Sequence, residues 1–178
     1  MNTISIYHVK LQKVGSLPFE TKPIHLPKDA AAIFQAYLGN YCHTDRENFI
    51  GMYLNTKNEV VGISTIHTGT LNASLVNPRE VFTDAVLHKA ASIILCHNHP
   101  SGNPSPSSED ITVTKNLQKA GKMLDIDVLD HIILGYDRFL SLKEQGLIDQ
   151  PNGEHELLWE NRMTKESARF ARTFDLER

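Results

Sequence analysis

The sequence predicts one mixed α/β (α+β) domain. Short apolar runs of strand-like composition are interspersed with longer segments in which apolar residues recur at helical spacing. A chain of 178 residues, 40% of them hydrophobic, is long enough to bury one core, and its two cysteines do not suggest a disulfide framework. We expect an N-terminal arm or linker over residues 1–28, the folded domain over 29–150, and a charged amphipathic helix over 151–178.

The N-terminal part contains an arm and then a first helix. Residues 2–14 alternate loosely between apolar and polar and can form a strand or an arm. Three prolines make residues 15–28 linker-like, and the last of them, Pro27, can also start a helix. Gly39 and Asn40 would end that helix.

The rest of the domain contains four predicted strands, a fifth short candidate, and two more helices. The strands are bounded by turn residues and cover residues 47–54, 59–67, 92–99 and 127–134, with the short candidate at 71–76. Asn77 as N-cap, Pro78 at N1 and Glu80 at N3 begin one helix. The other helix runs from residue 108 to residue 124, and residues 139–148 close the domain.

The third strand ends in two histidines, His97 and His99, separated by one residue. Successive strand side chains alternate faces, so both imidazoles point the same way, with Cα atoms roughly 6.6 Å apart. Two such imidazoles can bind one ion at Zn–N distances of ~2.0–2.1 Å. Pro100 then stops the strand, because proline cannot donate to the sheet ladder.

A carboxylate from the next segment can complete this set. The loop over residues 101–106 leads to Ser107 and Asp110 at the start of a helix. Two histidines and one aspartate leave a fourth tetrahedral position for water, which distinguishes a catalytic zinc from a structural one. Two simpler, purely structural explanations remain open. Ser107 can be a plain N-cap with Asp110 at N3, and a His-x-His pair can be incidental.

Taken together, these residues resemble the motif of the JAMM (JAB/MPN) metalloproteases. The matching pattern is His97-x-His99-Pro100, six residues, then Ser107-x-x-Asp110. The continuation to Asn103, with Leu-Asp-His-Ile-Ile-Leu-Gly at residues 129–135, resembles the RadC branch, and the similarity covers residues 29–150. The resemblance implies a curved mixed sheet flanked by helices, related in shape to the cytidine deaminases.

Hydrolysis at such a site needs a base as well as a metal. Zinc lowers the pKa of its bound water to about 7, and a carboxylate must still move the proton to the leaving amine. Glu80 is already explained by helix capping, whereas Glu47 precedes a buried strand and has no capping role. The family places its catalytic glutamate just before a strand, upstream of the histidines. Glu47 matches that placement, with one residue more before the aromatic Phe49 than some members have, and we assign it as the base.

The resemblance also implies roles around the ligands. Ser107 would donate a hydrogen bond to the oxyanion of the tetrahedral intermediate, a contact worth about 10²–10³ in rate. Asp130 or His131 could orient a ligand from behind, although a histidine inside an apolar strand is more often a satisfied core residue.

Several other interpretations are weighed against this one. The letters His97-Asn98-His99 invite comparison with HNH nucleases, but no ββα unit follows them. A DNA-repair-associated or protein-binding JAB module without peptidase activity is the main alternative. The net charge of −3 provides no basic field for nucleic acid, and the region before residue 29 is too short for a helix–hairpin–helix module. We therefore expect no strong nucleic-acid binding.

The remaining expectations concern location and partners. The N-terminus lacks the pattern of a signal peptide and no apolar run reaches membrane-spanning length, which predicts a cytoplasmic protein. The amphipathic helix over 151–178 would pack on its own domain, mediate homo-oligomerisation or bind a partner. We predict a Zn²⁺-dependent hydrolase of a peptide or isopeptide bond, and the sequence does not identify the peptide or protein substrate.

Overall fold

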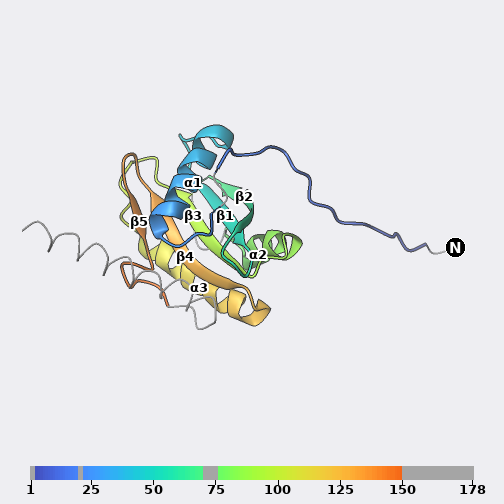
Figure 1. Ribbon diagram of the computed structural model, residues 1–178. Helices are drawn as coiled ribbons and strands as arrows, with labels where there is room; N and C mark the ends of the chain where they lie inside the picture. Colours follow the sequence, from blue (N-terminus) through green and yellow to red (C-terminus); the bar gives the residue numbers. More distant parts are fainter. Residues whose placement is uncertain (1–2, 20–21, 70–75, 150–178) are drawn as a thin grey trace, which may run out of the picture.

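The computed structural model describes residues 3–19, 22–69 and 76–149, which form one mixed sheet with helices on both faces (Figure 1). The predicted α/β class is confirmed. The sheet has five strands in the order β2-β1-β3-β4-β5. In chain order the elements are α1 (Pro27–Tyr41), β1 (Asn48–Leu54), β2 (Val60–Thr68), α2 (Pro78–Leu87), β3 (Ser92–Asn98), α3 (Ser108–Leu124), β4 (Asp127–Leu134) and β5 (Phe139–Ser141).

Strand β3 is the centre of the sheet. It pairs antiparallel with β1 and parallel with β4, while β2 and β5 lie at the two edges. All seven of its residues are buried. A strand covered on both faces has no polar face, which is why this segment appears in the sequence as a continuous apolar run.

Side-chain alternation along β3 separates two cores. Ile94 and Cys96 pack into the core under α1, whereas Ile93 and Leu95 pack into the core under α2 and α3. His97 follows in the same alternation and therefore faces the side of α2 and α3. His97, near the end of this central strand, thus directs its side chain toward the N-terminus of α3.

The predicted strands agree with the observed ones to within about one residue at their ends, which is the usual uncertainty of strand and helix limits. Residues 3–14 form an arm without regular structure, and α1 ends at Tyr41 rather than at Asn40. Ile24 is buried and its amide donates to the Asn58 carbonyl, so packed structure begins upstream of residue 29.

Two predictions fall outside the described residues. They are most of the short strand at 71–76 and the whole amphipathic helix at 151–178. Within the described residues, no helix has the length and apolar content needed to span a bilayer.

Candidate metal centre

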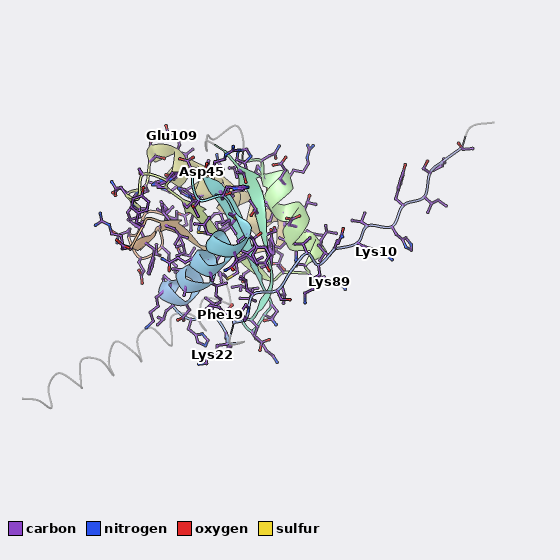
Figure 2. The ribbon with its side chains drawn as sticks, turned by 90° about the horizontal axis from the view of Figure 1, so that it is seen from above. Lys10, Phe19, Lys22, Asp45, Lys89 and Glu109 are labelled. Atoms are coloured by element: carbon purple, nitrogen blue, oxygen red, sulfur yellow. The ribbon has the colours of Figure 1, made fainter. Side chains whose placement is uncertain are left out.

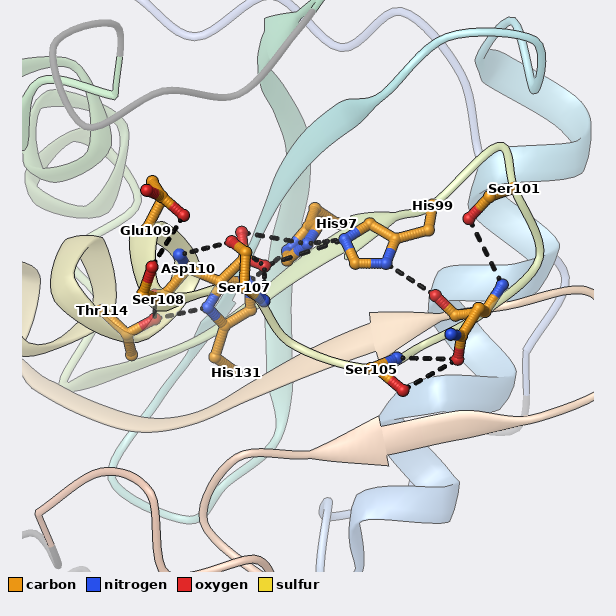
Figure 3. A network of polar contacts seen from close by, with 11 residues as sticks. His97, His99, Ser101, Ser105, Ser107, Ser108, Glu109, Asp110, Thr114 and His131 are labelled. Atoms are coloured by element: carbon orange, nitrogen blue, oxygen red, sulfur yellow. Dashed lines mark hydrogen bonds and ion pairs between the residues drawn. The ribbon is translucent and has the colours of Figure 1, made fainter.

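Three predicted ligands lie together beyond the end of β3. His97 Nε2 is 2.9 Å from His99 Nε2 and 3.4 Å from Asp110 Oδ1, and His99 Nε2 is 3.8 Å from Asp110 Oδ2 (Figure 3). Their ligand atoms all lie within 4.8 Å of one another. Ligand atoms around a tetrahedral zinc with bonds of ~2.0–2.1 Å are roughly 3.3 Å apart. The triangle therefore fits one such ion with small adjustments.

The start of α3 holds Asp110 in position. Ser107 is the N-cap, and its Oγ accepts a hydrogen bond from the Asp110 amide at 3.1 Å. In return, Asp110 Oδ2 accepts from the Ser107 amide at 2.8 Å and from the Ser107 hydroxyl at 2.7 Å. This reciprocal capping box engages one carboxylate oxygen and leaves Oδ1 facing His97. The N-cap interpretation of Ser107 and Asp110 is therefore compatible with Asp110 as a metal ligand, because the helix cap and the ligand position use different carboxylate oxygens.

A chain of hydrogen bonds assigns the proton on His97. Thr114 donates its hydroxyl hydrogen to the Asp110 carbonyl at 2.6 Å, so its oxygen must accept from His131 Nδ1 at 2.6 Å. Neutral His131 then has a lone pair on Nε2, which accepts from His97 Nδ1 at 2.8 Å. The remaining nitrogen, His97 Nε2, carries a lone pair directed at the ligand triangle. Thr114 and His131 thus set the tautomer of the first ligand.

His99 is fixed in the same way by the loop that follows it. Its Nδ1 lies 2.7 Å from the Asn103 carbonyl, which can only accept, so Nδ1 carries a proton, and in the neutral ring Nε2 carries the lone pair. Tyr136 holds this loop by donating from its hydroxyl to the Pro100 carbonyl at 2.7 Å. Gly135 is needed there, because a Cβ would collide with the Gly102 carbonyl.

Both Nε2 atoms therefore point lone pairs at each other and at a carboxylate oxygen. Burial lowers the pKa of His97 to about 4, and burial followed by the nearby His97 and His99 lowers the pKa of His131 well below its ordinary value. Lone pairs at this separation repel unless a proton or a metal cation lies between them. The arrangement can hold one metal ion with two nitrogen ligands and one oxygen ligand.

Glu47 lies immediately before β1. The β1–β3 register ends at the pair Phe49–His97, and Glu47 and His99 each lie two residues beyond that pair, where the two chains leave the sheet. The neighbouring Asn98 side chain holds this segment, because it accepts from the Asn48 amide at 2.9 Å and donates to the Arg46 carbonyl at 2.8 Å.

The other two carboxylates considered from the sequence lie elsewhere. Glu80 is exposed in the first turn of α2, where the Asn77 side chain accepts from the Arg79 amide as the N-cap. Asp130 is buried and binds the β5 region, accepting from the Ser141 hydroxyl at 2.6 Å. Of the residue pair 130–131, His131 contacts a ligand through its side chain, while Asp130 accepts from the His131 amide.

Comparison with known proteins identifies the family of this chain. Residues 24–147 match the family described as the RadC-like JAB domain. The chain belongs to the RadC-like JAB domain family. It is 49% identical over 138 residues to a UPF0758 protein of Desulforamulus reducens and 53% identical over 137 residues to one of Moorella thermoacetica. These alignments cover 77% of this chain, and 60% and 58% of the respective relatives, so the chain spans about three fifths of their length.

Sequence reasoning missed two parts of this RadC-like JAB domain site. Thr114 and the Asn103 carbonyl were not singled out, although both assign a histidine proton. Thr114 carried a usable signal, because it follows Asp110 by four residues and therefore lies on the same helix face. The carbonyl of Asn103 carries no signal in the sequence, since any residue supplies one.

Proposed function

We propose that this chain is a zinc-dependent hydrolase of a peptide or isopeptide bond. The observation that carries the proposal is the convergence of the Nε2 atoms of His97 and His99, 2.9 Å apart, beside Asp110 Oδ1. Two imidazoles and one carboxylate are ligands typical of a zinc that keeps a fourth position open. Bound there, zinc supplies a Lewis acid that polarises the scissile carbonyl and acidifies the attacking water.

In this proposal Glu47 moves the proton. It takes a proton from the attacking water as the water oxygen bonds to the carbonyl carbon. It then delivers that proton to the leaving nitrogen as the carbon–nitrogen bond breaks, yielding a carboxylic acid and an amine. The position of Glu47 supports this role, because Phe49 pairs with His97 and Glu47 and His99 each lie two residues beyond that pair.

Ser107 stabilises the charge that develops on the carbonyl oxygen. Its hydroxyl is exposed at the N-terminus of α3 and donates to Asp110 Oδ2 in the resting arrangement. Rotation of the hydroxyl toward substrate would leave the Ser107 amide still bonded to Asp110 Oδ2. Ser107 can thus donate to the oxyanion while its backbone keeps the ligand in place.

The test uses the full chain loaded with zinc. A mixed peptide library and a set of lysine-isopeptide-linked peptides serve as probes, with new termini counted by mass spectrometry. We expect zinc-dependent cleavage, and we expect Glu47→Gln to slow it by ~10²–10⁴ while its zinc content and fold stay unchanged. Glu80→Gln is the matched control and should cleave normally.

Two outcomes would contradict the proposal in different ways. A loaded chain that cleaves none of these probes would favour a JAB module that binds without hydrolysing. A Glu47→Gln variant with normal turnover, beside an inactive Glu80→Gln, would show that the base is wrongly assigned while the metal chemistry stands.

A further inference from the structure

Strand β2 leaves one edge of the sheet unpaired. It pairs antiparallel with β1, and in the described parts of the chain no strand pairs with its other side. Such an edge presents a row of amide and carbonyl groups ready to accept another strand. Natural proteins usually cover or pair an edge of this kind.

The same chain carries a segment suited to that edge. Residues 3–14 form an extended arm that leaves the folded domain, with Lys10 part-way along it (Figures 1 and 2). In residues 3–11, the part beyond the base, four apolar side chains are between 74% and 94% exposed, namely those of Ile4, Ile6, Tyr7 and Val9. In an extended strand Ile4 and Ile6 lie on one face, and Tyr7 and Val9 lie on the other. A strand that is apolar on both faces needs cover on both faces.

The β2 edge offers cover on both sides. A cavity of about 890 Å³ separates the edge from residues 11–17 at the base of the arm. Tyr37 and Tyr41 of α1 line one wall, and Asp84 and His88 of α2 line the other. The Tyr41 hydroxyl donates to the Ser16 carbonyl at 3.2 Å and so ties the arm base beside the cavity.

Charge and chain geometry indicate which copy supplies the strand. The inserted stretch, residues 3–11, contains Lys10 and no carboxylate, whereas the cavity contains the Asp84 carboxylate beside Lys13 of the arm base. Residues 6–14 contain no glycine, proline, asparagine, aspartate or serine, and the next glycine, Gly15, does not have a positive φ. The arm therefore leaves its own domain without a turn that would bring it back.

We propose that two copies of this chain exchange arms. Residues 3–11 of each copy lie as an added strand along the outer edge of β2 in the other copy, between α1 and α2. The exchange is symmetric, because each copy contributes one arm and one edge. It buries the apolar side chains of the arm and pairs the open edge in a single step.

The first test measures association of the full chain by sedimentation over a dilution series. The intact chain should form dimers. A variant with Ile4→Lys and Ile6→Lys should raise the dimer dissociation constant at least about tenfold, because charges replace the buried contacts. Val61→Lys, on the edge of β2, should do the same. Met123→Lys is the control, because Met123 is 87% exposed on α3 and lies outside the cavity.

A mixing experiment then separates arm exchange from any other dimer. The arm variant keeps a good edge, and the Val61→Lys variant keeps a good arm. Their mixture should therefore recover part of the association that each has lost alone. A monomeric intact chain, equal weakening by Met123→Lys, or a mixture no better than its components would overturn the proposal. Circular dichroism checks that each variant is folded.

Discussion

Two buried carboxylates, Asp110 and Asp130, lie on either side of His131 and have opposite surroundings. Asp110 is 6% exposed and Asp130 is fully buried. The backbone carbonyl of Asp110 accepts a hydrogen bond from the Thr114 hydroxyl, and Thr114 also contacts the His131 ring. The Asp130 carboxylate accepts a hydrogen bond from the His131 amide at 2.7 Å. His131 thus contacts both groups, the Asp110 group through its ring and the Asp130 carboxylate through its amide.

The two groups differ in how many hydrogen-bond donors face the acceptors within them. Around Asp130, the Ser141 hydroxyl and the amides of His131 and Lys143 all point hydrogens at the carboxylate. At Asp110, the Ser107 amide and hydroxyl donate to Oδ2, while Oδ1 faces His97 Nε2 and the hydrogens on the Nδ1 atoms of His97 and His99 point away, toward His131 and Asn103. We call the group around Asp130 the closed cluster, and the group of His97, His99 and Asp110, which can hold a cation, the open cluster. Burial of polar groups alone does not identify a functional site.

The largest effect is expected at the closed cluster. Burial raises the pKa of Asp130 from 3.8 to about 6 against the lowering effect of its hydrogen bonds, led by that from Ser141. A raised folded-state pKa contributes stability that is present below pH ~4 and is lost as pH rises through about 6. Relative to wild type, Asp130→Asn should therefore gain about 3 kcal/mol of unfolding free energy between pH 4 and pH 7.

Urea unfolding with chelator present measures this difference at the two pH values. A difference that stays constant with pH would mean that burial does not raise the pKa of Asp130 in the folded protein.

The link between the clusters is tested by His131→Phe. Phenylalanine keeps a ring against Phe49, which contacts the His131 ring edge-on at 5.4 Å, but it cannot accept from His97 Nδ1. The His97 proton is then no longer confined to Nδ1. Zinc affinity, measured by competition with a chromogenic chelator, should fall by about 10–100-fold. Unchanged affinity would remove the tautomer argument.

A smaller effect is expected one step further away. Thr114→Val removes the oxygen that accepts from His131 Nδ1, so zinc affinity should fall by less than in His131→Phe. Thr112→Val is a close control, because Thr112 also donates its hydroxyl to a carbonyl four residues earlier but is exposed. Equal losses in the two variants would indicate a general effect on α3.

Glu80 gives the smallest expected effect, because it belongs to neither cluster. Glu80→Gln removes one charge from the first turn of α2 and should cost at most about 1 kcal/mol of unfolding free energy. Thermal unfolding measures this cost, and zinc content should stay that of wild type. A loss of zinc in this variant would mean that the open cluster extends beyond the residues assigned to it.

Local pattern was enough to predict that His97, His99 and Asp110 come together, but not which residues contact them from behind. His97, His99 and Asp110 are recognisable because a strand period and a helix cap act over a few residues. His131 reaches His97 only because β3 and β4 pair in parallel with Leu95 opposite His131, across an intervening helix. Periodicity does not encode that register. For the same reason, the sequence showed Glu47 before a strand without showing that this strand pairs with β3 up to Phe49 and His97.

Zinc stoichiometry in Asp110→Ala, compared with wild type and Glu109→Ala, tests the central claim most directly. Glu109 is the adjacent exposed carboxylate, bonded to Ser108 in the same helix turn (Figure 3). After dialysis against zinc and then buffer, elemental analysis should find about one ion per chain in wild type and in Glu109→Ala. Asp110→Ala should lose most of it, because three protein ligands become two. Full occupancy in Asp110→Ala, or none in wild type, would contradict the account.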